Sequence, residues 1–156
     1  METQDNISRI LIAVEDSPYS DQAVRYGVML AKKMGSKLAM VHADEIPVST
    51  PYSADPMMSE TPLMIPEMMN IQEEASENLF KRITDEYGEG IKFTKYIRVG
   101  RAQDEILAVA QEYHADLIIL GTHGRTGLDH FISGSVSESV ARKAKCPVLI
   151  IPKKED

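Results

Sequence analysis

Cysteine and long apolar runs are scarce in this sequence, and each scarcity excludes a class of protein. Cys146 is the one cysteine among 156 residues, so no internal disulfide can form, which suits a reducing compartment. No apolar stretch approaches the roughly 20 residues that span a bilayer. The first residues, METQDNISR, lack the apolar run of a signal peptide. We therefore expect a cytoplasmic protein with no membrane partner.

Basic clusters are missing as well. The chain has 17 Lys and Arg against 24 Asp and Glu, a net charge of −7, and no stretch of basic residues offsets this excess. A nucleic-acid-binding surface needs such a cluster to neutralise phosphates, so we expect no nucleic-acid partner. The length fits one domain, which we place over residues 1–156.

Short apolar segments alternate with amphipathic ones, which predicts an α/β domain with a parallel sheet. The predicted strands are 10–14, 38–43, 91–99, 117–120 and 147–152. The predicted helices follow Ser17-Pro18, run from Met68 to about Gly88, span 102–113 and begin near Ser135. Segment 91–99 alternates apolar and polar residues, which indicates a strand near a sheet edge.

Proline and methionine interrupt this alternation at residues 45–66, which hold five of the eight prolines. We expect a loop there, and loops of this length are usually functional or mobile. Two interpretations stay open: an insertion without a role, or a lid or partner surface built on adaptable methionines.

Glycine is concentrated near the C-terminal end of the chain. Four of the nine glycines fall within fourteen residues: Gly121, Gly124, Gly127 and Gly134. They follow a predicted strand and precede a predicted helix, where ligands bind in open parallel sheets. Glycine permits close backbone approach, and a helix N-terminus offers free N–H groups to a phosphate. The stretch is therefore a candidate phosphate-binding loop.

Other phosphate-binding and catalytic patterns are absent. No glycine is followed by lysine and then Ser or Thr, as a P-loop requires, and the first strand is followed by EDSPYS without a glycine. The nucleophile elbow G-x-S-x-G is also absent.

The spacing Gly121-x2-Gly124-x9-Gly134-Ser135, with the trailing strand CPVLII, resembles the nucleotide-binding motif of the universal stress protein family, in its ATP-binding branch. The segments ILIAVEDSPYS and KLAMVHA resemble the first two strands of that family, so the similarity covers nearly the whole chain. It implies a single-domain Rossmann-like open sheet of five parallel strands, order 3-2-1-4-5, flanked by four helices. It also implies a homodimer that pairs through residues 147–152, an apolar edge that would otherwise be exposed.

The resemblance also implies a set of site residues. Gly121, Thr122, His123, Gly124 and Arg125 would line the ribose and phosphates; Gly134, Ser135, Val136 and Ser137 would cradle the phosphates; Ala13, Glu15 and Ala43 would face the ribose and adenine. Mg²⁺ or Mn²⁺ would suit the phosphate oxygens as a bridging ion.

This chain departs from the family at Glu15, where an Asp is usual, and the next residue is Asp16 instead of a small one. The longer side chain must bend to reach a ribose hydroxyl. Asp16 would replace Glu15 if the turn shifted by one residue.

Several of these residues have simpler interpretations. Ser135 and Glu138 have the spacing of a helix capping box, which needs no ligand. His42 lies in an apolar strand and suits a hydrogen-bonded core histidine. No Cys/His cluster indicates zinc or iron.

No catalytic residues are predicted, because no nucleophile–base pair is recognisable and no residue is identified that would position water for ATP hydrolysis. The predicted function is an ATP-binding switch or sensor in a stress response, with little or no turnover and an unknown protein partner. The alternatives are a dimeric interaction protein of the same fold that binds no nucleotide, or an ATP-consuming enzyme such as a weak ATPase.

Overall fold

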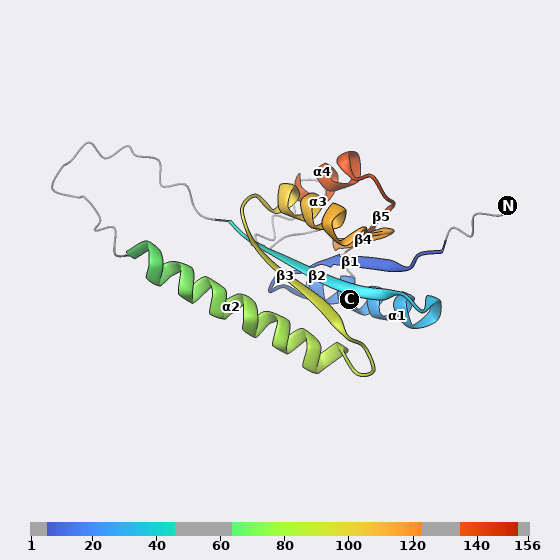
Figure 1. The fold of residues 1–156 in the computed structure, drawn as a ribbon, viewed down its shortest axis with the longest axis horizontal. Coiled ribbons are helices and arrows are strands. Elements are labelled where there is room, and N and C mark those ends of the chain that lie inside the picture. The colour runs from blue at the N-terminus through green and yellow to red at the C-terminus, as the bar shows by residue number, and fades with distance from the viewer. Residues whose placement is uncertain (1–5, 46–63, 123–134, 153–156) are drawn as a thin grey trace.

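The computed structural model describes residues 6–45, 64–122 and 135–152, which form strands and helices in strict alternation (Figure 1). The elements are β1 (Arg9–Ala13), α1 (Pro18–Met34), β2 (Lys37–Asp44), α2 (Met64–Tyr87), β3 (Phe93–Val99), α3 (Ala102–Tyr113), β4 (Leu117–Gly121), α4 (Ser135–Lys143) and β5 (Val148–Ile151). This confirms the predicted set of five strands and four helices.

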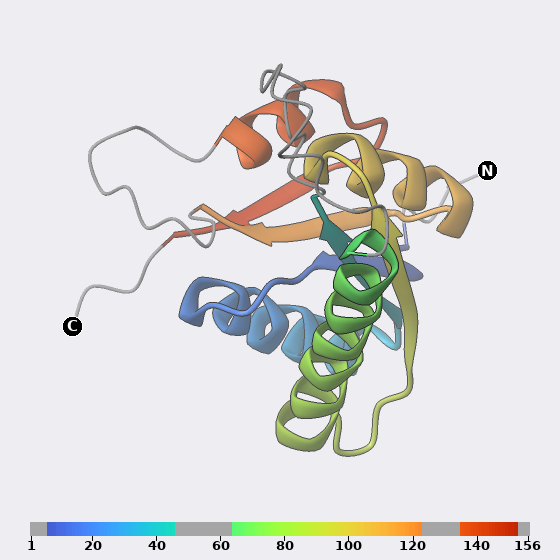
Figure 2. The same ribbon diagram turned by 90° about the vertical axis from the view of Figure 1, so that its left-hand side faces the viewer.

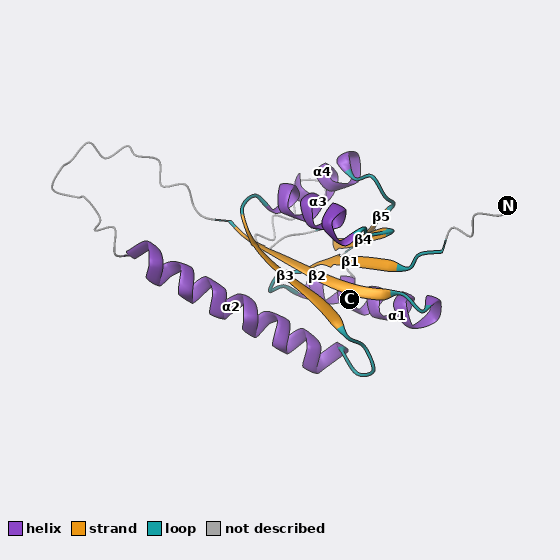
Figure 3. Ribbon diagram, viewed as in Figure 1, coloured by secondary structure: helices purple, strands orange, loops and turns teal. Residues whose placement is uncertain are grey.

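All strand pairs are parallel, and their order is β3-β2-β1-β4-β5. The predicted fold class and strand order are therefore confirmed, as is the edge position of β3. Helices α1 and α2 cover one face of the sheet and α3 and α4 the other (Figures 2 and 3). A parallel sheet covered on both faces needs apolar side chains in both directions, which explains the unbroken apolar runs of β1, β2 and β4.

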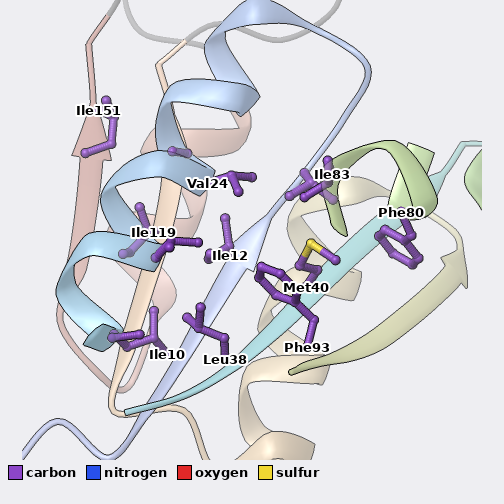
Figure 4. Packing of buried hydrophobic residues seen from close by; sticks show 14 of the residues in the cluster. Ile10, Ile12, Val24, Leu38, Met40, Phe80, Ile83, Phe93, Ile119 and Ile151 are labelled. Atoms are coloured by element: carbon purple, nitrogen blue, oxygen red, sulfur yellow. The ribbon is translucent and has the colours of Figure 1, made fainter. Parts of the chain in front are cut away.

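The side chains of each strand alternate between two cores. Ile10 and Ile12 of β1 pack under α1 and α2, together with Leu38, Met40 and Phe80 (Figure 4). Leu11, Ala39 and Val41 point to the opposite core, under α3 and α4. This alternation is the period of two that a pleated strand imposes.

Helix α1 begins as predicted. The Ser17 hydroxyl accepts a hydrogen bond from the Ser20 N–H at 3.3 Å, and Pro18 occupies the first helical position. Gly35 ends the helix with φ 70°, the left-handed conformation that glycine adopts without a Cβ penalty.

Helix α2 corrects two predictions. It begins at Met64, so the end of the predicted 45–66 loop is helical; residues 46–63 lie outside the described ranges. The predicted apolar face is buried only in its second half: Leu79 and Ile83 are buried, but Met68 is 48% and Ile71 67% exposed. The reason is visible in Figure 1, where the first turns of α2 extend beyond the sheet.

Some strand boundaries also differ from the predicted ones. β1 begins and ends one residue earlier, and β3 begins at Phe93 rather than Ile91. Main-chain hydrogen bonding to the neighbouring strand sets these boundaries, and an apolar run in the sequence does not reveal where that bonding begins or ends.

Candidate functional site

The strand order places a topological switch point between β1 and β4. β1 is followed through α1 by β2 on one side, whereas β4 lies on the other side of β1. In open α/β sheets, ligands bind at the carboxyl ends of the strands at such a point. The candidate site is therefore the edge formed by the carboxyl ends of β2, β1 and β4.

The described candidate residues gather at this edge. Ala13 ends β1 and pairs with Val41, two residues before Ala43 on β2. Gly121 ends β4, and the Thr122 N–H continues the ladder to the Ile151 carbonyl at 3.0 Å.

Helix α4 contributes two described candidate side chains, in its first turn. Val136 is half-buried, and Ser137 is 2% exposed. Ser135 begins the helix, but its side chain is outside the description, as are His123, Gly124, Arg125 and Gly134. The roles predicted for these residues, including the capping box, stay predictions.

The turn after β1 holds Glu15 in a defined position. The Glu15 N–H donates to the Ser20 hydroxyl at 2.9 Å, and the Ser17 hydroxyl donates to the Glu15 carboxylate at 3.2 Å. Ser20 is 3% exposed. Sequence reasoning named Ser17 only as a helix cap and did not name Ser20; the three-residue spacing of the two serines after an acidic residue was the available signal.

Asp16 lies in a different environment from Glu15. Its side chain is 73% exposed, and its carboxylate is 3.7 Å from the Arg82 guanidinium of α2. Arg82 also makes a two-pronged contact with Asp21 of α1, at 3.0 and 3.1 Å, and this hydrogen-bonded carboxylate raises the pKa of Arg82. The contact joins α1 to α2 beside the turn and turns Asp16 toward α2.

Gly121 is positioned where a side chain has little room. A Cβ built there would lie 3.0 Å from the carbonyl oxygen of Tyr19, in the first turn of α1. The start of α1 therefore approaches the end of β4 closely, which explains glycine at the first position of the motif without any ligand.

The described part of the chain provides hydroxyls and a carboxylate at this edge, but no ready-made metal centre. Within residues 6–45, 64–122 and 135–152, no group of three His, Cys, Asp or Glu side chains is placed to hold a metal ion. Cys146 lies at the opposite edge, just before β5, where burial raises the pKa of its thiol. Over the same residues, no helix has the length and apolar character needed to cross a membrane.

Comparison with known proteins agrees with this geometry. Residues 6–152 match the universal stress protein family. Universal stress protein MJ0531 of Methanocaldococcus jannaschii is 30% identical over 149 residues, which cover 94% of this chain and 84% of the relative.

Solved structures show the same fold. Protein MJ0577 superposes with a TM-score of 0.81 at 24% identity, covering 97% of this chain and 99% of the other. A universal stress protein in complex with cAMP reaches 0.67 at 21% identity, covering 94% and 98%, respectively. The Archaeoglobus fulgidus protein in complex with dAMP reaches 0.60 at 20%, covering 93% and 98%. The chain belongs to the universal stress protein family.

Proposed function

We propose that this protein binds ATP at the carboxyl ends of β1 and β4 and acts as a nucleotide-dependent switch with little or no turnover. The observation that carries the proposal is the position of the two ends of the glycine motif. Gly121 ends β4 at the switch point, and Ser135 begins α4, so the motif connects the two elements that a phosphate site of this kind requires. The cAMP and dAMP complexes of related folds support an adenine nucleotide as the ligand.

The described residues suit the parts of such a ligand. The half-buried Glu15 carboxylate, oriented by Ser17, would accept a hydrogen bond from a ribose hydroxyl. The main chain at Ala43 would face the adenine. The N-terminus of α4 would donate N–H groups to the phosphates, favoured by the helix dipole. Gly121 would keep the end of β4 free of a side chain.

A divalent ion would be held mainly by the nucleotide. Because no group of three acidic, cysteine or histidine side chains in the described ranges could hold a metal ion, we propose that the phosphate oxygens of ATP supply most ligands to Mg²⁺ or Mn²⁺. Hydroxyls such as that of Thr122 would complete the set. The ion would neutralise phosphate charge.

The switch would act by holding two segments of the site together when ATP is bound. ATP that contacts both Thr122 and the start of α4 would hold these two segments together, and loss of ATP would release them. A partner protein would distinguish the two states. We propose no catalytic residue, because the sequence identifies no residue that would position water for ATP hydrolysis.

The test begins with the nucleotide itself. Purified protein is denatured and any released nucleotide is identified by mass spectrometry, followed by ATP titration calorimetry with and without Mg²⁺. We expect ATP to bind, and the double substitution Gly134→Asp with Ser135→Ala to abolish binding, because it adds negative charge beside the phosphates. Gln111→Glu, which adds one negative charge at an exposed position near the end of α3, is the control and should bind normally.

Each outcome of these binding experiments favours a different function. Unchanged affinity in the double variant would refute the site, and absence of any nucleotide binding by the unmodified protein would favour an interaction protein of the same fold. Rapid release of phosphate would instead favour an ATPase.

A further inference from the structure

A buried polar chain runs from the end of β1 through β2 to α2. The His42 ring contacts the Val14 carbonyl through Nδ1 at 2.8 Å and the Asp44 carboxylate through Nε2 at 3.1 Å. The Ser76 hydroxyl lies 2.9 Å from the other Asp44 oxygen. Ser76 is 1% exposed, and the side chains of His42 and Asp44 are 16% and 15% exposed. Sequence reasoning expected a hydrogen-bonded core histidine at position 42, but did not name Asp44 or Ser76.

The donor and acceptor roles in this row of hydrogen bonds follow from what each group can donate. A carbonyl oxygen only accepts, so His42 Nδ1 donates to Val14, and Nε2 faces the Asp44 carboxylate. The Ser76 hydroxyl has one proton and two acceptors at 2.9 Å, Asp44 Oδ2 and the Gln72 carbonyl. Each polar atom therefore has a partner, and the orientation of the His42 ring is set from both sides.

These hydrogen-bonded groups lie next to the proposed nucleotide site. Val14 lies between Ala13 and Glu15, and His42 immediately precedes Ala43, so the ring joins the two strand ends that would face the ribose and adenine. The Val14 N–H is held by the Val41 carbonyl at 2.9 Å, and the Val14 carbonyl by the His42 ring. The His42 ring thus hydrogen-bonds the main chain at the first residue after β1.

The end of β2 is fixed to two further elements. The Asp44 carbonyl accepts from the Gly100 N–H at 3.0 Å, and the Glu45 carboxylate accepts from the Ala102 N–H at the start of α3, at 3.1 Å. The segment from His42 to Glu45 thus contacts β1, α2, the turn after β3 and α3. A displacement of the His42 ring would be transmitted to the strand ends, because the surrounding contacts leave β2 little freedom to compensate.

We propose that His42 is a positioning residue for the nucleotide site, with Asp44 and Ser76 orienting its ring. The proposal rests on the proposed nucleotide function for its consequence, but not for its geometry. His42 holds the Val14 carbonyl and thereby fixes the direction in which Glu15 leaves β1. It does not contact the ligand.

The experiment measures position and affinity separately. Amide hydrogen exchange at Glu15 is recorded in the nucleotide-free protein, and ATP affinity by calorimetry, for the unmodified protein and for His42→Phe, Asp44→Ala and Asp44→Asn. Loss of a hydrogen bond with a charged partner predicts about tenfold faster exchange and about tenfold weaker ATP binding in His42→Phe and Asp44→Ala. Asp44→Asn can turn its amide N–H toward Nε2 and its oxygen toward the Ser76 hydroxyl, so it should leave both values close to those of the unmodified protein.

Ser36→Ala is the matched control. The Ser36 hydroxyl donates to the Ile7 carbonyl at the opposite edge of the sheet, so its loss removes the same kind of bond away from the site. Ser36→Ala should lower the thermal stability of the protein but leave Glu15 amide exchange and ATP affinity unchanged. A spectroscopic signature completes the test: in ¹⁵N spectra of the histidine rings, His42 Nδ1 should carry a proton with and without ATP.

The outcomes are distinguishable. If His42→Phe and Asp44→Ala leave Glu15 exchange as Ser36→Ala does, the positioning role is wrong whether or not ATP binds. If the unmodified protein binds no ATP, the proposed function fails, and the exchange data still decide what His42 does. Asp44→Ala carries the test should His42→Phe not fold, since it keeps the imidazole and removes only the carboxylate that orients it.

Discussion

At the scale of single residues, Glu15 stands where the family resemblance leads us to expect an aspartate. Its carboxylate is kept in place by the Ser17 hydroxyl at 3.2 Å and its N–H by Ser20 at 2.9 Å. Asp16, by contrast, is 73% exposed and lies toward Arg82. Glu15 is thus better placed than Asp16 to act as the ribose-binding carboxylate of the proposed site.

The first prediction concerns this carboxylate. Glu15→Gln should weaken ATP binding about tenfold, because a hydrogen bond to a charged acceptor contributes roughly 1.5–3 kcal/mol. The same substitution should have little effect on 2′,3′-dideoxy-ATP, which has no ribose hydroxyl to donate. Calorimetry with both nucleotides gives the comparison. An equal loss for the two ligands would mean that Glu15 does not contact the ribose, and Asp16→Asn is the matched control with no expected change.

The second prediction concerns pH and Cys146. Burial raises the pKa of this thiol above its ordinary value, so less reactive thiolate is present near neutral pH in the folded protein. Alkylation by iodoacetamide at pH 8 should be slower in the folded chain than in urea.

The raised pKa of Cys146 also makes the free energy of unfolding depend on pH. Since the pKa is higher in the folded state, the stabilising contribution is present below the pKa of the unfolded thiol and is lost as pH rises through the folded value. The fall in unfolding free energy from neutral to alkaline pH should therefore be smaller in Cys146→Ala. A fast folded-state alkylation or an identical pH profile would contradict the burial of the thiol.

At the scale of elements, the packing of α1 on the sheet depends on Gly27. A Cβ at this position would lie 2.4 Å from Ile12 Cδ1 and 2.9 Å from Ile12 Cγ1, in the core between α1 and β1. A glycine inside a helix is unfavourable in isolation, so its presence here is explained by close approach of the helix to the sheet.

The third prediction follows from this contact. Gly27→Ala should destabilise the protein by about 1–3 kcal/mol through overpacking, less about 1 kcal/mol that alanine gains as a helix former. Urea unfolding measures the net change. Adding Ile12→Val removes the clashing Cδ1 and should recover part of the loss, so the double variant should be more stable than the sum of the two single variants. Additive losses would show that the helix shifts instead of clashing.

At the scale of the whole molecule, the two sheet edges differ. β3 forms one edge, with exposed Thr94 and Lys95, which discourage pairing with another chain. β5 forms the other, and Val148, Leu149 and Ile150 are apolar yet only half-buried. We therefore propose that a second copy of the chain pairs along β5 over residues 147–152, as the family resemblance implies.

The fourth prediction tests this dimer. Ile150→Lys places a charge on the apolar edge and should convert a dimer into a monomer in light scattering after size exclusion. Lys95→Glu on β3 is the control at the opposite edge and should leave the mass unchanged. A monomeric unmodified protein, or a dimer that survives Ile150→Lys, would show that the interface lies elsewhere.

The sequence by itself determined the elements, their order along the chain and the start of α1, because these depend on local periodicity and on residues such as Ser17 and Pro18 that act on their own neighbours. Its resemblance to the family also supplied the strand order, which the structure confirms, and this order brings Ala13, Ala43 and Gly121 to one edge, where their binding roles stay predictions.

Only the tertiary structure decided which residues far apart in the chain meet. The exposure of Met68 and Ile71 depends on where the sheet ends, and no helical pattern reports that. The link from Val14 through His42 and Asp44 to Ser76 joins residues up to 62 positions apart, and the tie of Arg82 to Asp21 spans 61. Such contacts depend on the crossover geometry of the sheet, which brings distant segments together by packing and not by local preference.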